Sequence, residues 1–467
     1  MKRSIRGKAA WSMSMVKHSM IVVLVAIALV ATACAPFVST SGEGSIQIFF
    51  GTPTGARALS DPPFSELPVF SAITIKVSGP GMDPVEFTVD ATQTSFTAMV
   101  PGGSDRTVEL YAPVDWNATA ALLPDYEYLM PKLVKAYGAT TTIDVVPGQR
   151  VTAVLRLEVA ETKILLPDPS TGSLFFEDSI SDSSISGGGA LIITSDARLK
   201  FDRLGRLFAD IGLASPILNQ SADGTSTNLV PLIGISGDLF DIDRSQNRIF
   251  RVHYDSINYI TVISIINLNM ESISDIWLAP PVDYSIDSYG GIAIGNDDIL
   301  FVSAWGPAEE QGILKLDTSN NSLVSMGFKS MESLGLGYYD SGNFNSLTIT
   351  DMTIIDGKLY VALDEHNVFG NYNHRGKIVE IDLSTFSKSR EIGWSADVIL
   401  ADPASQFYGP KRFVAIKPRR LTFVDEGNSD SPGANVDRVV EVDLDSWSIT
   451  GILNLEGIVS FYNSYYY

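Results

Sequence analysis

The stretch Met352-Thr-Ile-Ile-Asp-Gly-Lys-Leu-Tyr-Val-Ala-Leu363, followed by Ile378-Val-Glu-Ile-Asp382, sets the pattern of the C-terminal half of the chain. It reads as a strand, a tight polar turn, a second strand, a variable connection and a third strand that ends in Asp. The same pattern recurs at 291–304 with 313–317 and at 413–424 with 439–443, and more loosely at 199–209 and 239–252. Repetition of one supersecondary unit predicts an array of similar sheets.

Four-stranded units that recur every 40 to 60 residues or so are typical of propeller blades. Over residues 190–467 the chain resembles the NHL and YVTN type of bacterial β-propeller. The resemblance implies an all-β fold with five or six blades, in which Ala190–Thr194 could complete the last blade and close the ring. It implies no particular activity, because this scaffold carries many functions.

The repeat also predicts where a binding site lies. Adjacent strands of a blade run in opposite directions, so the first-to-second and third-to-fourth turns fall on one side of the disc, here called the short-turn face. The other connections form the long-loop face. The long segments all belong to this second face, at 305–311, 329–346, 364–376, 394–411 and 425–436. Long loops on a rigid scaffold are where binding residues are usually found.

The candidate binding residues of the long-loop face are aromatic and acidic side chains with two histidines. They are Trp305, Tyr338, Tyr339, Asp364, Glu365, His366, Tyr372, His374, Tyr408 and Asp425. Aromatic residues among carboxylates suit a protein partner or a glycan. The alternative is that the polar members are solvated loop residues and the aromatic ones fix the loops in place.

Metal and catalytic sites are not predicted from any motif. His366 and His374 share one connection, but no helical spacing makes them converge, so we assign no metal ligands and no cofactor, although a divalent metal at this face stays open. The segment 241–247 resembles the start of a calcium loop, but Gln246 replaces the required glycine, which favours a hairpin turn. The recurring strand-end residues Asp317, Asp382 and Asp443 are predicted to cap turns. No catalytic residue can be assigned, since nucleophile elbow and phosphate-loop motifs are missing.

The region 45–177 is predicted to be a small antiparallel β-sandwich. Short alternating segments such as 45–50, 72–77 and 95–100 are separated by glycine and proline turns. The piece Val100–Thr107 resembles the strand-turn-strand of Ig-like or transthyretin-like modules, which implies a spacer or an adhesive unit. Residues 178–189, rich in Ser, Asp and Gly, are predicted to be the linker to the propeller at 190–467.

The amino terminus predicts export. Residues 1–33 carry five basic and no acidic residues and end in an apolar run, as signal peptides do. The sequence Ala31-Thr32-Ala33-Cys34 resembles the lipobox of bacterial lipoproteins, with Ala31 where leucine is usual. The resemblance implies lipidation of Cys34, with 34–44 as a flexible tether. An uncleaved anchor over 20–38 and a plain secreted protein are the alternatives.

Charge and cysteine content limit the partners. The chain has 33 basic and 54 acidic residues, and loss of the five basic residues of the signal lowers the net charge from −21 to −26. Such a surface repels nucleic acid and anionic lipid, so membrane attachment depends on the lipid. Cys34 is the single cysteine, which excludes an internal disulfide. We therefore expect an exported cell-envelope protein, lipid-anchored to the cell membrane or the outer membrane, that binds a protein or glycan without catalysis. A metal-assisted hydrolase or lyase and a structural spacer are the alternatives.

Overall fold

The structure is a computed structural model. It describes residues 42–50, 69–118, 133–168, 173–177, 186–187, 198–201, 207–210, 217–220, 227–230, 239–244, 248–255, 260–267, 275–287, 290–295, 298–308, 310–320, 322–337, 346–366, 376–393, 407, 409–425 and 437–455. The predicted signal peptide, Cys34, the tether up to residue 41 and the strand 190–194 lie outside these ranges. Within them, no helix is both long and apolar enough to cross a membrane.

The N-terminal sandwich consists of two sheets around one core. The smaller sheet contains β4 (Ser95–Pro101), β1 (Glu43–Phe50) and β7 (Arg150–Leu155) in that order. The larger sheet contains β3 (Met82–Val89), β2 (Ile73–Gly79), β5 (Gly103–Pro113), β6 (Val134–Val145) and β8 (Glu158–Thr162). The pairing departs from the purely antiparallel prediction, because β1 runs parallel to β7.

Strict alternation explains why these segments form half-buried strands. In β1 the side chains of Ile46, Ile48 and Phe50 are buried, while Gln47 between them is partly exposed. In β2, Ile73 and Ile75 follow the same rule. A period of two places every second side chain on the core face, so each strand has one apolar and one polar side.

The C-terminal half, as far as it is described, forms five successive antiparallel sheets, each built from strands consecutive in sequence. Their strands are β12 (Leu199–Phe201), β13 (Leu207–Asp210), β14 (Ile217–Gln220) and β15 (Thr227–Val230); β16 (Leu239–Asp243), β17 (Arg248–Asp255), β18 (Ile260–Asn267) and β19 (Asp275–Leu278); β20 (Ser285–Ile286), β21 (Ile292–Ile294), β22 (Ile299–Trp305), β23 (Gln311–Asp317) and β24 (Val324–Ser330); β25 (Ser346–Ile355), β26 (Lys358–His366), β27 (Lys377–Asp382) and β28 (Ser387–Gly393); and β29 (Pro410–Phe413), β30 (Arg420–Asp425), β31 (Arg438–Asp443) and β32 (Ser448–Asn454). In the third sheet the first strand is interrupted, and both β20 and β21 pair with β22.

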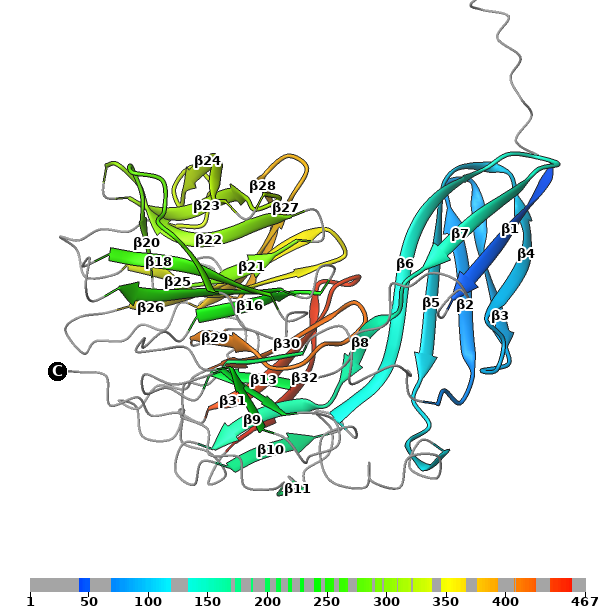
Figure 1. Ribbon diagram of the computed structural model, residues 1–467, viewed down its shortest axis with the longest axis horizontal. Coiled ribbons are helices and arrows are strands. Elements are labelled where there is room, and N and C mark those ends of the chain that lie inside the picture. The colour runs from blue at the N-terminus through cyan, green and yellow to red at the C-terminus, as the bar shows by residue number, and fades with distance from the viewer. Residues whose placement is uncertain are drawn as a thin grey trace, which may run out of the picture.

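These sheets are arranged around a common axis (Figure 1). The first strand of each sheet contacts the first strand of the next, from β12 to β16, β21, β25 and β29. Between neighbouring sheets lie separate apolar clusters, such as the one that joins Phe301 and Ile313 to Val361 and Val379. Four-stranded sheets packed face to face with their first strands innermost define a β-propeller. The predicted all-β propeller fold is therefore confirmed at this level.

A further three-stranded sheet corrects the predicted domain division. It contains β9 (Ile164–Asp168), β10 (Ser173–Glu177) and β11 (Ser186–Gly187). The sequence predicts the first two in the sandwich and the third in the linker 178–189. Instead, Ile164 and Leu166 pack against Val424 and Val439 of the last sheet. Alternating apolar residues predict a strand but not which core receives it.

The sandwich is joined directly to the short-turn face of the propeller. The passage from β8 to β9 runs beside the β29–β30 connection, where the Thr162 amide donates to the Ile416 carbonyl at 2.8 Å. The Ile416 amide in turn donates to Thr162 Oγ1 at 3.0 Å. Phe201, at the end of β12, is buried in the sandwich core, and Ile416 packs against it. The start of β1 lies at the opposite end of the sandwich (Figure 1).

Candidate functional site

The short-turn face contains hairpins whose backbone geometry follows from their residues. Asp356 and Gly357, between β25 and β26, have φ angles of 50° and 70°. Asp298 and Arg419 adopt the same left-handed conformation at the equivalent turns, with φ of 61° and 53°. Asp and Gly tolerate this region well, whereas Arg419 does so at some cost.

The predicted role of the strand-end aspartates is confirmed. Asp317 Oδ1 accepts from the Ser319 amide at 2.8 Å, and Asp382 Oδ1 accepts from the Ser384 amide at 2.9 Å. Asp443 Oδ1 accepts from the Ser446 amide at 2.8 Å. These carboxylates satisfy turn amides, so they are structural residues of the repeat.

Two of these turns also contact the preceding sheet. Trp447, with φ of 51° in the β31–β32 turn, donates from Nε1 to the Glu391 carbonyl at 2.8 Å. Its ring lies 4.3 Å from the Arg390 guanidinium. Phe386, at the equivalent position of the β27–β28 turn, packs on Phe301 with ring centroids 5.8 Å apart. Both turns therefore couple neighbouring sheets through an aromatic side chain.

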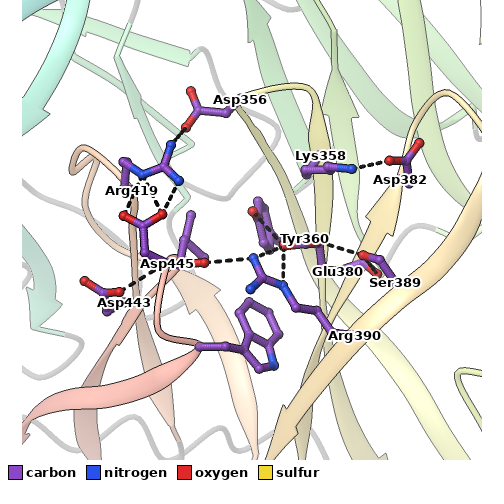
Figure 2. Close-up of polar contacts among 12 residues, drawn as sticks. Asp356, Lys358, Tyr360, Glu380, Asp382, Ser389, Arg390, Arg419, Asp443 and Asp445 are labelled. Atoms are coloured by element: carbon purple, nitrogen blue, oxygen red, sulfur yellow. Dashed lines mark hydrogen bonds and ion pairs between the residues drawn. The ribbon is translucent and has the colours of Figure 1, made fainter. Parts of the chain in front are cut away.

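The polar cluster in Figure 2 has a structural role. Glu380 accepts from Arg390 at 2.6 Å, from Ser389 at 2.7 Å and from Tyr360 at 3.1 Å. Burial disfavours the charge on Glu380, but the hydrogen bonds from Arg390 and Ser389 outweigh it, so the pKa of Glu380 lies below its usual value. Burial and the nearby Glu380 charge raise the pKa of Tyr360. Arg390 also donates to the Leu444 carbonyl of the next sheet at 2.8 Å, so the cluster joins two sheets.

The structure places part of the predicted long-loop site. Trp305 ends β22, Asp364 lies in β26 and Asp425 ends β30. Glu365 and His366 belong to β26, but only their backbone is described. The remaining candidates lie outside the described residues; they are Tyr338, Tyr339, Tyr372, His374 and Tyr408.

Asp364 and Asp425 are brought together, but as buried residues rather than as exposed ligand contacts. Asp425 is fully buried; it accepts from the Gly409 amide at 2.8 Å and from Arg438 at 2.8 Å. Asp364 is 9% exposed and accepts from Lys411 at 2.6 Å. A Cβ on Gly409 would lie 2.8 Å from Asp364 Oδ1, so a larger residue at 409 would displace the Asp364 carboxylate. This junction fixes the frame beneath the long loops, and the prediction of these two aspartates as surface contacts is corrected.

Trp305 is the one candidate with a described side chain that is partly exposed. It is paired with Ser285 on one side and Gln311 on the other. The Gly306 amide donates to the Glu310 carbonyl at 2.9 Å and closes the connection after Trp305. Gln311, which is buried, donates to Asp287 at 2.7 Å. Trp305 therefore stands at the rim of the long-loop face on a rigid hydrogen-bonded support.

The centre of the propeller is crossed by an ion pair that the sequence did not reveal. Arg198, just before β12, donates to Asp351 of β25 at 2.5 Å and to the Gly290 carbonyl at 2.8 Å. Asp351 also accepts from the Phe413 amide of the last sheet at 3.0 Å. One buried pair thus connects four sheets near the axis. Because 153 residues separate its members, no local signal could identify it.

The described side chains form no candidate metal site. Among them, no group of three or more His, Cys, Asp or Glu residues is placed to hold a metal ion. Among Asp364, Glu365, His366 and His374, Asp364 alone has a described side chain, and it pairs with Lys411.

Together, the sheets and their innermost strands define the chain as an all-β protein of the propeller class. No protein-family model and no curated protein matches the sequence. The assignment to the propeller class therefore rests on the arrangement of the sheets and not on a family match.

Several solved structures are distantly similar. A putative TolB from Agrobacterium tumefaciens is 9% identical, with 63% of this chain and 87% of that one covered and a TM-score of 0.35. A GH43 endo-arabinanase from Bacillus licheniformis is 10% identical, with 54% and 95% covered and a TM-score of 0.31. Hydrazine synthase from Kuenenia stuttgartiensis is 13% identical, with a TM-score of 0.28; 46% of this chain is covered, and the chain spans 48% of that one. Similarities of this size define no activity.

Proposed function

We propose that this protein is a lipid-anchored component of the bacterial cell envelope that binds a protein or a glycan, without catalysis, through the long-loop face of its propeller. One observation carries the proposal: the sandwich occupies the short-turn face through Thr162, Phe201 and Ile416. The start of β1, which follows the tether, lies at the far end of the sandwich. A lipid on Cys34 would then leave the long-loop face directed away from the membrane.

The architecture supports this role. We infer a six-bladed propeller, in which β9 to β11 supply an incomplete blade packed against the last sheet by Ile164 and Leu166. The Ig-like sandwich acts as a stalk, with direct hydrogen bonds rather than a flexible linker at its junction with the propeller. A stalk joined in this way holds the binding face in a fixed direction.

Photo-crosslinking in intact envelopes tests the binding face. A diazirine amino acid is placed at Ala308 on the long-loop face or, as the matched control, at Asn320 on the short-turn face of the same sheet; both positions are exposed. Because a diazirine inserts into C–H and O–H bonds, it labels a protein or a glycan alike. We expect adducts with a molecule other than a second copy of this chain from position 308, and none from 320. Adducts from 320 only, or from neither position, contradict the proposed face.

The anchor is tested separately with Cys34→Ser. We expect the wild-type chain to partition into the detergent phase and to incorporate labelled fatty acid, and the variant to do neither. If the variant still behaves as a membrane protein, the lipid anchor is wrong, but the crosslinking result on the binding face stands by itself.

A further inference from the structure

The outer edge of the third sheet exposes apolar side chains. Among the described strands, its last strand, β24, pairs with β23 and with no other. Val324 is 55% exposed and Met326 is 52% exposed, both on this outermost strand. Large apolar residues on a free strand edge are unusual, because such an edge also offers unpaired backbone groups to another chain.

The equivalent outer strands of the next two sheets, β28 and β32, have polar residues at these two positions. Val324 is opposite the strand-end residue Asp317. The equivalent positions are Ser387, opposite Asp382, and Ser448, opposite Asp443. All three outer strands then contain a bulge. The bulge residue is Met326 in the third sheet and Ser389 or Thr450 in the next two.

The hydroxyl groups in the other two sheets have local partners. Ser389 donates to Glu380 Oε1 at 2.7 Å, and Thr450 donates to Glu441 Oε1 at 3.3 Å. Met326 has no such role, so in the third sheet a hydrogen-bonded hydroxyl is replaced by a thioether facing solvent. Compared with a hydroxyl group, the methionine side chain exposes more apolar surface to solvent and cannot form the equivalent hydrogen bond.

The outer edges of the fourth and fifth sheets are also protected in ways that β24 is not. β28 carries Lys388, Arg390 and Glu391, and charges on an edge strand oppose pairing with another strand. In β32, Leu453 is buried against Ile164 of β9. In β24 the segment 324–328 is uncharged, and the ammonium group of Lys329 is turned to the Phe386 carbonyl at 2.6 Å.

Symmetry points to a second copy as the occupant. The chain is acidic overall, but the uncharged segment 324–328 sets no like charges opposite each other when two copies meet there. The sequence Val324-Ser325-Met326 is also nearly self-complementary. Antiparallel pairing about Ser325 sets Val324 of each copy opposite Met326 of the other, as a two-fold interface requires. We propose that β24 pairs edge to edge with β24 of a second copy and forms a homodimer.

A disulfide trap tests this contact. With Cys34→Ser the chain has no native cysteine, and Ser325→Cys then places one thiol of each copy next to the two-fold axis. We expect mild oxidation to give a covalent dimer. Lys388→Cys is the matched control, because Lys388 occupies the same register position in β28. No dimer from Ser325→Cys, or equal dimer from both variants, overturns the proposal.

Sedimentation equilibrium gives an independent test. Val324→Lys and Met326→Lys each place a charge on the edge and should weaken dimerisation roughly tenfold or more. Ser387→Lys, at the position equivalent to Val324, should leave the dimer unchanged. Unchanged circular dichroism shows that each variant is folded. A wild-type chain that is monomeric contradicts the β24 contact. So does a chain whose self-association is equal with and without the lysine substitutions. If β24 instead binds a different protein, that protein replaces the second copy as the partner.

Discussion

Thr162 and Ile416, 254 residues apart, exchange two hydrogen bonds, one through the Thr162 amide and one through its hydroxyl. The pair joins the last strand of the sandwich to the inner region of the last propeller sheet. Since Thr162 is fully buried, water cannot replace either bond. The two halves of the protein therefore share an interface that depends on specific groups.

Thr162→Val tests this interface. The variant keeps the side-chain shape but leaves the Ile416 amide without its acceptor, which should lower the free energy of unfolding by about 1 to 3 kcal/mol. The midpoint of urea unfolding measures the loss. Thr97→Val, at an exposed position of β4, is the control and should change little. Equal midpoints for both variants would mean that the hydroxyl contributes nothing to the junction.

The axial pair of Arg198 and Asp351 should be strongly coupled. Removing either partner leaves a buried charge uncompensated, so Arg198→Met and Asp351→Asn should each cost about 3 to 5 kcal/mol. The double variant should cost less than the sum of the two, as a double-mutant cycle of thermal or urea unfolding can determine. Additive losses would show that the two side chains act independently.

Gly409→Ala should destabilise the long-loop side of the propeller. The new methyl group would approach Asp364 Oδ1 to 2.8 Å, and we expect a loss of roughly 1 to 3 kcal/mol in unfolding free energy. Shortening the opposing side chain with Asp364→Ser should restore part of the stability in the double variant. If the double variant is no better than Gly409→Ala alone, the close contact is not the cause.

Glu441 should make stability depend on pH in the acid range. Burial disfavours its charge, but hydrogen bonds and charges from Lys417 and Arg420 prevail and hold the pKa of Glu441 below its usual value of 4.5. A depressed pKa in the folded state contributes stability above the unfolded-state pKa, and this contribution is lost as pH falls through the folded-state pKa. Glu441→Gln should therefore flatten the decline of the urea midpoint below about pH 4.5. A decline as steep as in the wild type would assign the acid sensitivity to other carboxylates.

The sequence predicted features that depend on neighbours along the chain. The strand-end residues Asp382 and Asp443 sit within a few residues of the amides they cap, so their role follows from the turn itself. The repeated strands follow from alternation within each unit. These signals were sufficient for the all-β propeller fold.

Features that depend on distant partners could not be predicted. Asp425 was expected on a loop, because nothing near it indicates that Arg438 and the Gly409 amide will enclose it. The apolar residues Ile164 and Leu166 alternate along the chain as those of the sandwich strands do. Their packing beside Val424 could therefore not be predicted from the sequence. The candidate site was predicted only as a face, with Trp305 as its described and partly exposed member.

The junction at Thr162 has a consequence for biosynthesis. Ribosomes deliver the sandwich strands first, yet the hydrogen-bonding partner of Thr162 and the apolar surface that covers Ile164 emerge more than 250 residues later. Contacts between such distant segments are slow to form, because the entropy of closing a long loop is lost before the contacts provide any stabilisation. The nascent chain must therefore keep the apolar side of β9 from aggregating until its final sheet arrives.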